Sequence, residues 1–460
     1  MGRQMFLVDI LAKHVVGQRY ASLPPEVVEQ AKRCLLDTTG NMIGGRFTAK
    51  GDLINQYAVR WSNTGEATVV GSGKVHREAA AFANAVLARM LDLDDGHRFA
   101  FGHPAGTLVS TALALGEVSG ASGHDVIVAL VAGYDVYARL GKAINPSSYH
   151  ERGFDATGVA GSVAVAAVAA QLYKLDEKKT KDALGIAALQ AGGIIEYQND
   201  GTMGKVLCPG WATSTGIKAA DLADLGFTGP EAVFEGKKGF FQAFSNKYEA
   251  SRLTEQLGEK HGILQNYFKL HACMRGLHCA VDAVLSLKEA YSLNGANVQK
   301  ISINSSSFVE RLNKPHPKTI VGAQCSLPFS VAVALKYGAV NEQTIGAGMN
   351  DAEIGAIEDR VEVVIDDKVQ EYWAKNPDHW AAVEIEITTK DGRQLVEWVP
   401  VASGEPEKPL SREQLRAKFS QLVSPTKFYK DIGALLETIA KFDEIKNIRE
   451  FTALLGEKQD

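Results

Sequence analysis

Cysteine is scarce in this sequence and follows no pairing pattern. The 460 residues include five cysteines, scattered along the chain without a Cys-x-x-Cys pair. An odd and dispersed set of this kind argues against a disulfide framework and against a zinc knuckle. It is typical of a protein in a reducing compartment, so we expect a cytoplasmic location.

Long hydrophobic runs are also missing. Residues 1–17 alternate apolar and polar side chains without a continuous apolar segment, so we expect no signal peptide. The longest apolar run, residues 159–172, consists mostly of Ala and Val and is too short to span a bilayer. We interpret this run as a buried helix and expect no membrane partner.

Neither sign of charge dominates the composition. Lys and Arg number 49 against 54 Asp and Glu, which gives a net charge of −5. This balance gives no reason to expect nucleic acid as a partner, and a small anionic substrate would need a local positive pocket. The hydrophobic content of 45% and the length of 460 residues are typical of a globular protein with two or three domains.

The spacing of apolar residues predicts helices in the first half of the chain. We expect helices over residues 5–18, from the Pro24-Pro25 turn to about residue 40, over 54–61, and almost continuously from 78 to 225. Gly44-Gly45 is expected to break the second of these. Small residues dominate throughout, as in helices that pack closely in a large bundle.

The pattern changes at about residue 266. Alternation at 298–303 and 360–365 predicts strands, and the segments 382–388 and 393–398 flank Asp391-Gly392, a strong hairpin signal. Helices are expected at 279–291 and 326–337, and again from 411 to 455. The predicted fold class is therefore mainly α with an α+β portion. We expect a helical domain over 1–266, a smaller α+β domain over 267–401, and C-terminal helices over 402–460 that complete the helical domain.

The strongest chemical signal lies between two apolar helical runs. Three acids (Asp92, Asp94 and Asp95) and two histidines (His97 and His103) occur within twelve residues. Such groups are costly to bury unless they are paired or used, and acids are unfavourable at a helix C-terminus. The acids could bind a metal, but the sequence has no matching second acidic motif, so we expect none. The histidines could act in general acid–base catalysis, because imidazole titrates near neutral pH; a purely structural role is the alternative.

Two further stretches supply cations and more imidazoles. Lys205 follows a polar loop, and residues 269–278 hold Lys269, His271, Arg275 and His278 within ten positions. Such a set could hold carboxylates and transfer protons. Cys273, in the same stretch, could serve as an acid–base thiol, although an ordinary buried thiol is the alternative.

Several motifs follow one another in a characteristic order along the chain. They are Ala83-Asn84-Ala85, Leu91-Asp92-Leu93-Asp94-Asp95, His103-Pro104, Gly153-Phe154-x-x-Thr157-Gly158, Lys205-x-Leu207-x-x-Gly210, the segment 226–236, Lys269-x-x-x-Cys273-x-x-x-x-His278, and the segment 326–332. In this order they resemble the MmgE/PrpD family, which includes 2-methylcitrate dehydratase, cis-aconitate decarboxylase and iminodisuccinate epimerase. The resemblance runs from about Leu7 to the C-terminus.

The resemblance implies a fold and a site. It implies a large helical domain, an α+β lid domain, usually a homodimer, and an active site in the cleft between the domains without a metal or an organic cofactor. The shared chemistry is proton removal or delivery at a carbon next to a carboxylate of a small polycarboxylate substrate, whose enolate-like charge needs preorganised donors. The family residues it implies around the polycarboxylate are Asp92, His103, Lys205 and Lys269. With the other candidates in the sequence, we expect catalysis by Asp92, His103, Lys205, Lys269 and His271, and substrate binding by His97, Asp155, Cys273, Arg275 and His278.

Four positions depart from the family pattern. Gly96 stands where related dehydratases and decarboxylases usually carry Thr, and Asp155 and Cys208 each replace a His. Met274 falls where the decarboxylase carries a His of its catalytic site. These losses of polar groups argue against decarboxylation of cis-aconitate by this chain and, less strongly, against the 2-methylcitrate assignment.

Three functions remain open from the sequence. We expect a dehydratase-like lyase acting on a small di- or tricarboxylate. One alternative is an epimerase of an amino- or imino-dicarboxylate, in which Lys269 or His271 would face an acid or imidazole of the 92–103 stretch. Another is a catalytically silent binding protein on the same fold, which would pair Lys205 and Lys269 with protein acids.

Overall fold

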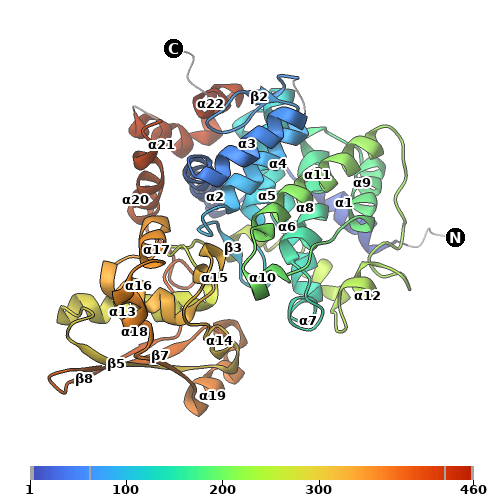
Figure 1. Ribbon diagram of the computed structural model, residues 1–460. Coiled ribbons are helices and arrows are strands. Elements are labelled where there is room, and N and C mark those ends of the chain that lie inside the picture. Colours follow the sequence, from blue (N-terminus) through green and yellow to red (C-terminus); the bar gives the residue numbers. More distant parts are fainter. Residues whose placement is uncertain (1–4, 62–63, 429–430, 457–460) are drawn as a thin grey trace.

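The computed structural model describes residues 5–61, 64–428 and 431–456, and it divides into a large helical body and a smaller α+β domain (Figure 1). The body begins with helices that follow one another with short connections. These are α1 (Leu7–Gly17), α2 (Pro25–Arg46), α3 (Ala49–Trp61), α4 (Arg77–Arg89), α5 (Pro104–Ser119), α6 (Gly123–Ile144), α7 (Ser147–His150), α8 (Ala156–Leu172), α9 (Glu177–Leu189), α10 (Tyr197–Asp200), α11 (Gly204–Asp224) and α12 (Phe240–Phe244).

Two short antiparallel strand pairs accompany this series. Strands β1 (Ala67–Thr68) and β2 (Lys74–Val75) pair with each other, and β3 (Gly96–His97) pairs with β4 (Asn266–Tyr267). The second pair joins the loop after α4 to the segment that leads into the second domain. It therefore fixes the acid- and histidine-rich stretch against that segment.

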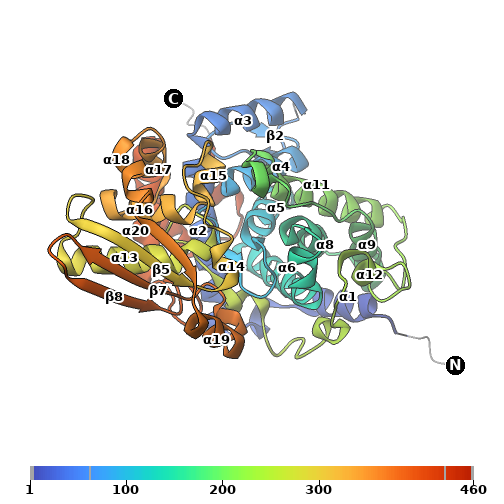
Figure 2. The same ribbon diagram turned by 60° about the horizontal axis from the view of Figure 1, so that its bottom comes forward.

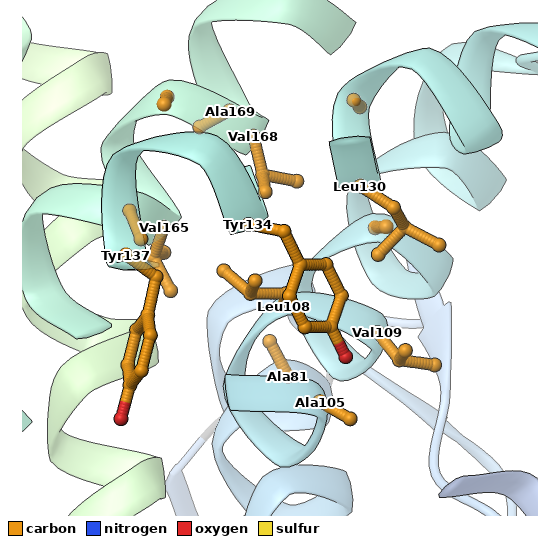
Figure 3. Packing of buried hydrophobic residues seen from close by; sticks show 14 of the residues in the cluster. Ala81, Ala105, Leu108, Val109, Leu130, Tyr134, Tyr137, Val165, Val168 and Ala169 are labelled. Atoms are coloured by element: carbon orange, nitrogen blue, oxygen red, sulfur yellow. The ribbon is translucent and has the colours of Figure 1, made fainter. Parts of the chain in front are cut away.

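The centre of the body is helix α8, which is buried along almost its whole length. Its Ala and Val side chains allow α6 and α11 to approach closely; Figure 3 shows Tyr134 of α6 beside Leu108 and Val168. A Cβ atom on Gly133 of α6 would lie 2.6 Å from Val168 Cγ2, so the glycine is required by this close helix contact. The prediction of a buried helix over 159–172 is confirmed.

The expected break at Gly44-Gly45 is wrong. Helix α2 continues through both glycines to Arg46. A Cβ atom on Gly45 would lie 2.2 Å from the carbonyl oxygen of Leu87, so the glycine lets the backbones of α2 and α4 approach closely. Tertiary packing here outweighs the low helix propensity of glycine.

The second domain is a four-stranded sheet with helices packed on it. The sheet order is β6-β5-β7-β8; β5 and β6 are parallel, and the other neighbours are antiparallel. The predicted strands and the hairpin at Asp391-Gly392 are confirmed. The elements are α13 (His278–Tyr291), β5 (Val298–Ser305), α14 (Ser307–Glu310), α15 (Ile320–Gln324), α16 (Leu327–Tyr337), α17 (Glu342–Gly348), α18 (Ala352–Glu358), β6 (Val361–Ile365), α19 (Asp367–Lys375), β7 (Val383–Thr389) and β8 (Gln394–Val399).

The sheet buries one face against α13, which packs on β7 and β8 (Figure 2). Strand β7 alternates buried and half-buried residues, with Val383, Ile385 and Ile387 directed into the domain core. This core is separate from the core of the helical body.

The chain then returns to the helical body through α20 (Arg412–Val423), α21 (Ile432–Ala440) and α22 (Arg449–Leu455). Helix α20 packs on α2, where Phe419 contacts the position of Gly40. Lys418 of α20 lies 2.5 Å from an oxygen of Asp37 on α2 and donates to the carbonyl of Leu93 at 2.7 Å. The C-terminal helices therefore support the loop that carries the acid cluster. Among the described helices, none combines the length and apolar character needed to cross a membrane.

Candidate active site

A cavity lies between the helical body and the second domain. It has a volume of about 70 Å³ and contains side chains from both parts. The lining residues are Arg89, Asp92, His97, Arg98, Phe101, His103, Tyr149, Asp155, Tyr197, Gln198, Lys205, Tyr267, Lys269, Met274, Arg275, Phe308, Cys325 and Trp380. Seven of the ten predicted site residues are therefore brought together: Asp92, His97, His103, Asp155, Lys205, Lys269 and Arg275.

Asp92 is the centre of a cluster of charged side chains, the charged wall, which it forms with Arg89, Asp94, Lys205 and Lys269. It lies just after α4 with a φ of 54°, a left-handed conformation that Asp tolerates better than most residues. Lys205, at the start of α11, lies 2.8 Å from Oδ2, and Lys269 lies 3.0 Å from Oδ1. Lys269 also donates to the Asp92 carbonyl at 3.1 Å. The carboxylate thus joins the body to the segment that enters the second domain.

Arg89 adds a third cation to this wall. Its Nη1 lies 3.0 Å from Asp94 and 3.5 Å from Asp92. Three cations against two carboxylates leave one excess positive charge on a buried wall. Burial alone would raise the pKa of Asp92, but Lys205, Lys269 and Arg89 hold that pKa well below its usual value. Burial lowers the pKa of Lys269, and the nearby Asp92 offsets part of this effect.

His103 presents a neutral base beside the charged wall. It is the residue before α5, and its Nδ1 lies 2.5 Å from the carbonyl oxygen of Asp95. Because a carbonyl can only accept, Nδ1 carries the proton and Nε2 keeps a lone pair. Burial, together with Arg89 and Lys269, holds the pKa of His103 well below its usual value. The ring is therefore neutral and can accept a proton at Nε2.

A group of phenols forms another part of the cavity. Asp155 precedes α8 and accepts from the backbone N–H of Thr157 and from the hydroxyl of Tyr197, both at 2.8 Å. Gln198 donates to the Tyr149 hydroxyl at 2.6 Å. Sequence reasoning did not select Tyr149, Tyr197 or Gln198, although the polar loop before Lys205 was a signal for the last two.

Two arginines are held by one carboxylate from the segment after the sheet. Glu405 Oε1 lies 2.5 Å from Arg275 Nε, and Oε2 lies 3.3 Å from Arg98. Arg98 also pairs with Glu407. The guanidinium of Arg275 lies over the ring of Trp380, with 4.8 Å from its carbon to the ring centroid. Glu405 thus fixes one arginine from each part of the protein, and no sequence signal indicated it.

His97 also lines the cavity, but it is almost fully buried. Burial lowers its pKa to about 3, and the nearby Lys142 acts in the same direction. The ring is neutral across the physiological pH range. Its Nδ1 accepts from the backbone N–H of Ala100 at 3.3 Å, which shapes the loop between β3 and α5.

Three predicted site residues do not line the cavity: His271, Cys273 and His278. His271 Nε2 lies 2.8 Å from Asp282, and His278 Nε2 donates to the carbonyl of Cys273 at 3.2 Å. Burial raises the pKa of the Cys273 thiol, so it stays protonated. These contacts lie within the second domain, where they hold the segment before α13 that carries Lys269.

The acid cluster divides its oxygens among protein partners. Both oxygens of Asp94 accept from Arg89 at 3.0 Å. Asp95 accepts from the backbone N–H of Ala105 at 3.0 Å and from the Tyr134 hydroxyl at 3.1 Å, and burial raises its pKa well above the usual value. In the part of the chain that the structure describes, no three His, Cys, Asp or Glu side chains are grouped to hold a metal.

The structure explains one of the four departures noted in the sequence. A Cβ atom on Gly96 would lie 2.1 Å from the hydroxyl oxygen of Tyr267, so a threonine cannot be accommodated beside this ring. Asp155 and Met274 line the cavity, whereas Cys208 does not. The cavity therefore has a carboxylate and a thioether where the family pattern places imidazoles.

The fold and the site together define a class of protein, in which a helical body and an α+β domain enclose a site of aspartate, lysine and histidine side chains. The MmgE/PrpD N-terminal domain matches residues 9–253, and the MmgE/PrpD C-terminal domain matches residues 271–430. The chain belongs to the MmgE/PrpD family, as its motifs had indicated.

Curated relatives match almost the whole chain. The cis-aconitate decarboxylase-like protein oryM of Aspergillus oryzae is 26% identical, over 97% of this chain and 96% of that protein. Human cis-aconitate decarboxylase is 25% identical, over 98% of this chain and 94% of its own length. The cis-aconitate decarboxylase of Aspergillus terreus is 26% identical, over 94% of this chain and 92% of its own length.

Proposed function

We propose that this protein is a cofactor-independent lyase of the dehydratase type, acting on a small di- or tricarboxylate. The observation that carries the proposal is the placement of His103. Its Nδ1 is fixed by the Asp95 carbonyl, and the ring lines the same cavity as Lys205, Lys269 and Arg89. A neutral base beside excess positive charge suits removal of a proton from a carbon next to a carboxylate.

The lysines keep hydrogen-bonding capacity for a substrate. An ammonium group has three N–H donors. Hydrogen bonds between described residues use one donor of Lys205 and two of Lys269, all directed at Asp92. The remaining donors and the excess charge can hold a substrate carboxylate, while Asp92 keeps both ammonium groups in place.

The proposed step is an elimination in which all atoms and electrons balance. His103 Nε2 takes the proton from the carbon next to the carboxylate, and the C–H electrons form the new C=C bond. The C–O bond to the neighbouring hydroxyl breaks, and the proton returns from His103 to that oxygen, which leaves as water. Charge that builds up on the substrate carboxylate in the transition state is stabilised by Lys205, Lys269 and Arg89.

The relatives support the substrate class. Those reported above are named as cis-aconitate decarboxylases or proteins like them, and cis-aconitate is a tricarboxylate. The identities of 25% and 26% leave the reaction of this chain open, and the departures at Asp155 and Met274 favour elimination over decarboxylation.

The direct test is turnover of a small panel of hydroxy acids. Citrate, 2-methylcitrate and malate are added to the full-length protein, and the new double bond is followed by ultraviolet absorbance and identified by NMR. We expect at least one of them to be dehydrated. Failure with the whole panel, including longer incubation at high protein concentration, would falsify the dehydratase assignment. Release of carbon dioxide from cis-aconitate, measured in parallel, would show decarboxylation instead.

One observation favours a second candidate, a binding protein without catalytic activity. Lys205 and Lys269 are both paired with Asp92, and the cavity of about 70 Å³ is small for a tricarboxylate. A binding protein would be stabilised by the hydroxy acids of the panel, but it would not exchange their protons with solvent. Deuterium exchange at the carbon next to the carboxylate separates the two, because only an active enzyme exchanges that proton with solvent.

A further inference from the structure

Tyr267 lies directly on Gly96. The two residues face each other in register between β3 and β4. A Cβ atom on Gly96 would lie 2.1 Å from Tyr267 Oη and 2.2 Å from Cζ, so no side chain fits at position 96 while the ring keeps its place. Gly96 does not have a positive φ. The approach of the ring, rather than the backbone conformation, therefore explains the glycine.

The hydroxyl of Tyr267 has no hydrogen-bond partner among the described residues. The side chain lines the cavity and is only 6% exposed. Among the described residues we find no hydrogen bond to its Oη, whereas Tyr149 and Tyr197 on the same cavity are both hydrogen-bonded. A largely buried hydroxyl normally has a partner, so a cavity ligand is the natural one.

The ring is held in this position by charged neighbours. The guanidinium carbon of Arg275 lies 5.0 Å from the centroid of the ring, and Glu405 fixes that guanidinium. Burial raises the pKa of Tyr267, so the hydroxyl is neutral and keeps its proton. The cavity therefore has a neutral donor at Tyr267 in addition to the cations at Asp92.

We propose that Tyr267 is a specificity-determining residue whose hydroxyl, seated against Gly96, hydrogen-bonds an uncharged oxygen substituent of the substrate. The substituent is a hydroxyl group on the polycarboxylate, because carboxylates are attracted to Arg89, Lys205 and Lys269 instead. This inference rests on the proposed function, since it assumes that a polycarboxylate occupies the cavity. A substrate without the hydroxyl leaves Tyr267 unpaired and binds more weakly.

The test compares two probes with the same carbon skeleton. Citrate carries a hydroxyl group, and tricarballylate lacks it. Calorimetry on the full-length protein should show that the wild type prefers citrate about tenfold, the value of one neutral hydrogen bond. Tyr267→Phe removes only the hydroxyl oxygen and should bring this preference close to one, with the tricarballylate affinity changed less than twofold. Tyr57→Phe, at an exposed tyrosine of α3, is the matched control and should keep the preference.

The outcomes separate this inference from the proposed function. If the wild type binds both probes and Tyr267→Phe keeps the wild-type preference, the role of Tyr267 is wrong and the carboxylate site stands. If the wild type binds neither probe, the polycarboxylate site fails, and this inference fails with it.

A double-mutant cycle tests the contact with Gly96 by a separate measurement. Gly96→Ala displaces the ring and should weaken citrate binding at least tenfold. In the Tyr267→Ala background the same substitution meets no ring and should cause less than a twofold further loss. Equal losses in both backgrounds would show that the ring does not depend on the glycine.

Discussion

Two buried aspartates in this protein are each surrounded by basic groups, yet their environments differ in kind. Asp135 of α6 lies 2.9 Å from His14 Nε2 and 3.1 Å from His261 Nδ1, and it accepts from the backbone N–H of Gly262 at 2.7 Å. None of these residues lines the interdomain cavity. At Asp92 the partners are two lysines with donors to spare, and the imidazole of His103 is fixed by a backbone carbonyl instead.

The difference shows what distinguishes a structural network from a candidate reactive one. At Asp135 each histidine contacts the acid through one ring nitrogen, and neither ring lines the cavity. At Asp92 the histidine keeps a lone pair and the lysines keep N–H groups next to a cavity. Burial and charge pairing are common to both, so neither property alone identifies a site.

The largest expected effect is on catalysis at His103. We expect His103→Ala to lower kcat about 10²- to 10⁴-fold, the usual contribution of a general base, while the protein stays folded. His261→Gln, in the Asp135 network, is the matched control and should keep kcat within a few-fold of the wild type. Steady-state kinetics and circular dichroism measure both. Near-native turnover by His103→Ala would place the base elsewhere.

Removal of the charge on Asp135 should mainly affect stability. Asp135→Asn leaves His14, His261 and Arg139 without a buried anion, and we expect a loss of about 3–5 kcal/mol in the free energy of unfolding. Urea denaturation measures it. Citrate affinity should stay unchanged if the variant is folded at 15 °C. A large change in citrate affinity with little change in stability would contradict the structural role.

Stabilisation of the protein by bound citrate should distinguish the Asp92 network from the Asp135 network less strongly. Citrate at a hundred times its Kd should stabilise the wild type by about 2.7 kcal/mol, because it binds only the folded state. Lys205→Met removes one cation of the charged wall and should abolish most of the resulting rise in Tm. His14→Gln should keep the rise, measured from its own lower Tm. Equal rises in Lys205→Met and the wild type would show that citrate binds away from Asp92.

The smallest expected effect is a difference in pH dependence between activity, which depends on His103, and stability, which depends on Asp135. The pKa of His103 is held below its usual value, so the base stays neutral and kcat/KM should hold constant as pH falls through 6.5, with a decline only at more acid pH. Burial alone would raise the pKa of Asp135, but hydrogen bonds from His14 and His261 lower it to about 2.

The sign of the Asp135 contribution follows from that pKa. The folded value lies below the unfolded value of about 3.9, so the stabilisation is complete above that pH and is lost as pH falls through about 2. Activity profiles and urea midpoints between pH 2 and 8 measure the two groups separately. A kcat/KM that declines with an apparent pKa at or above 6.5 would contradict the environment assigned to His103.

The sequence predicted the helices and strands better than the tertiary contacts between them. Periodicity located α8, the strands and the hairpin, because their burial follows a regular pattern. The run through Gly44-Gly45 was missed, since helix propensity takes no account of the neighbouring α4. The family resemblance was enough to place Asp92, His103, Lys205 and Lys269 on one cavity.

The residues that were missed depend on tertiary contacts. Arg89 belongs to a largely apolar helix, and Glu405 lies in a loop far along the chain from the arginines it holds. Tyr267 is brought beside Gly96 by the pairing of β3 with β4 and lines the cavity. His271 and His278 have suitable chemistry, but they use it within the second domain. Residue type and spacing could not distinguish these cases.

The contact between Lys418 and Asp37 has a consequence for biosynthesis. It joins positions 381 residues apart, and Lys418 also supports the loop at Leu93. During translation the face of α2 that receives α20 stays uncovered until the whole second domain has been made and the chain has returned. The ribosome therefore releases the stretch that carries Asp92 long before its last support, and the charged wall is completed only near the end of synthesis.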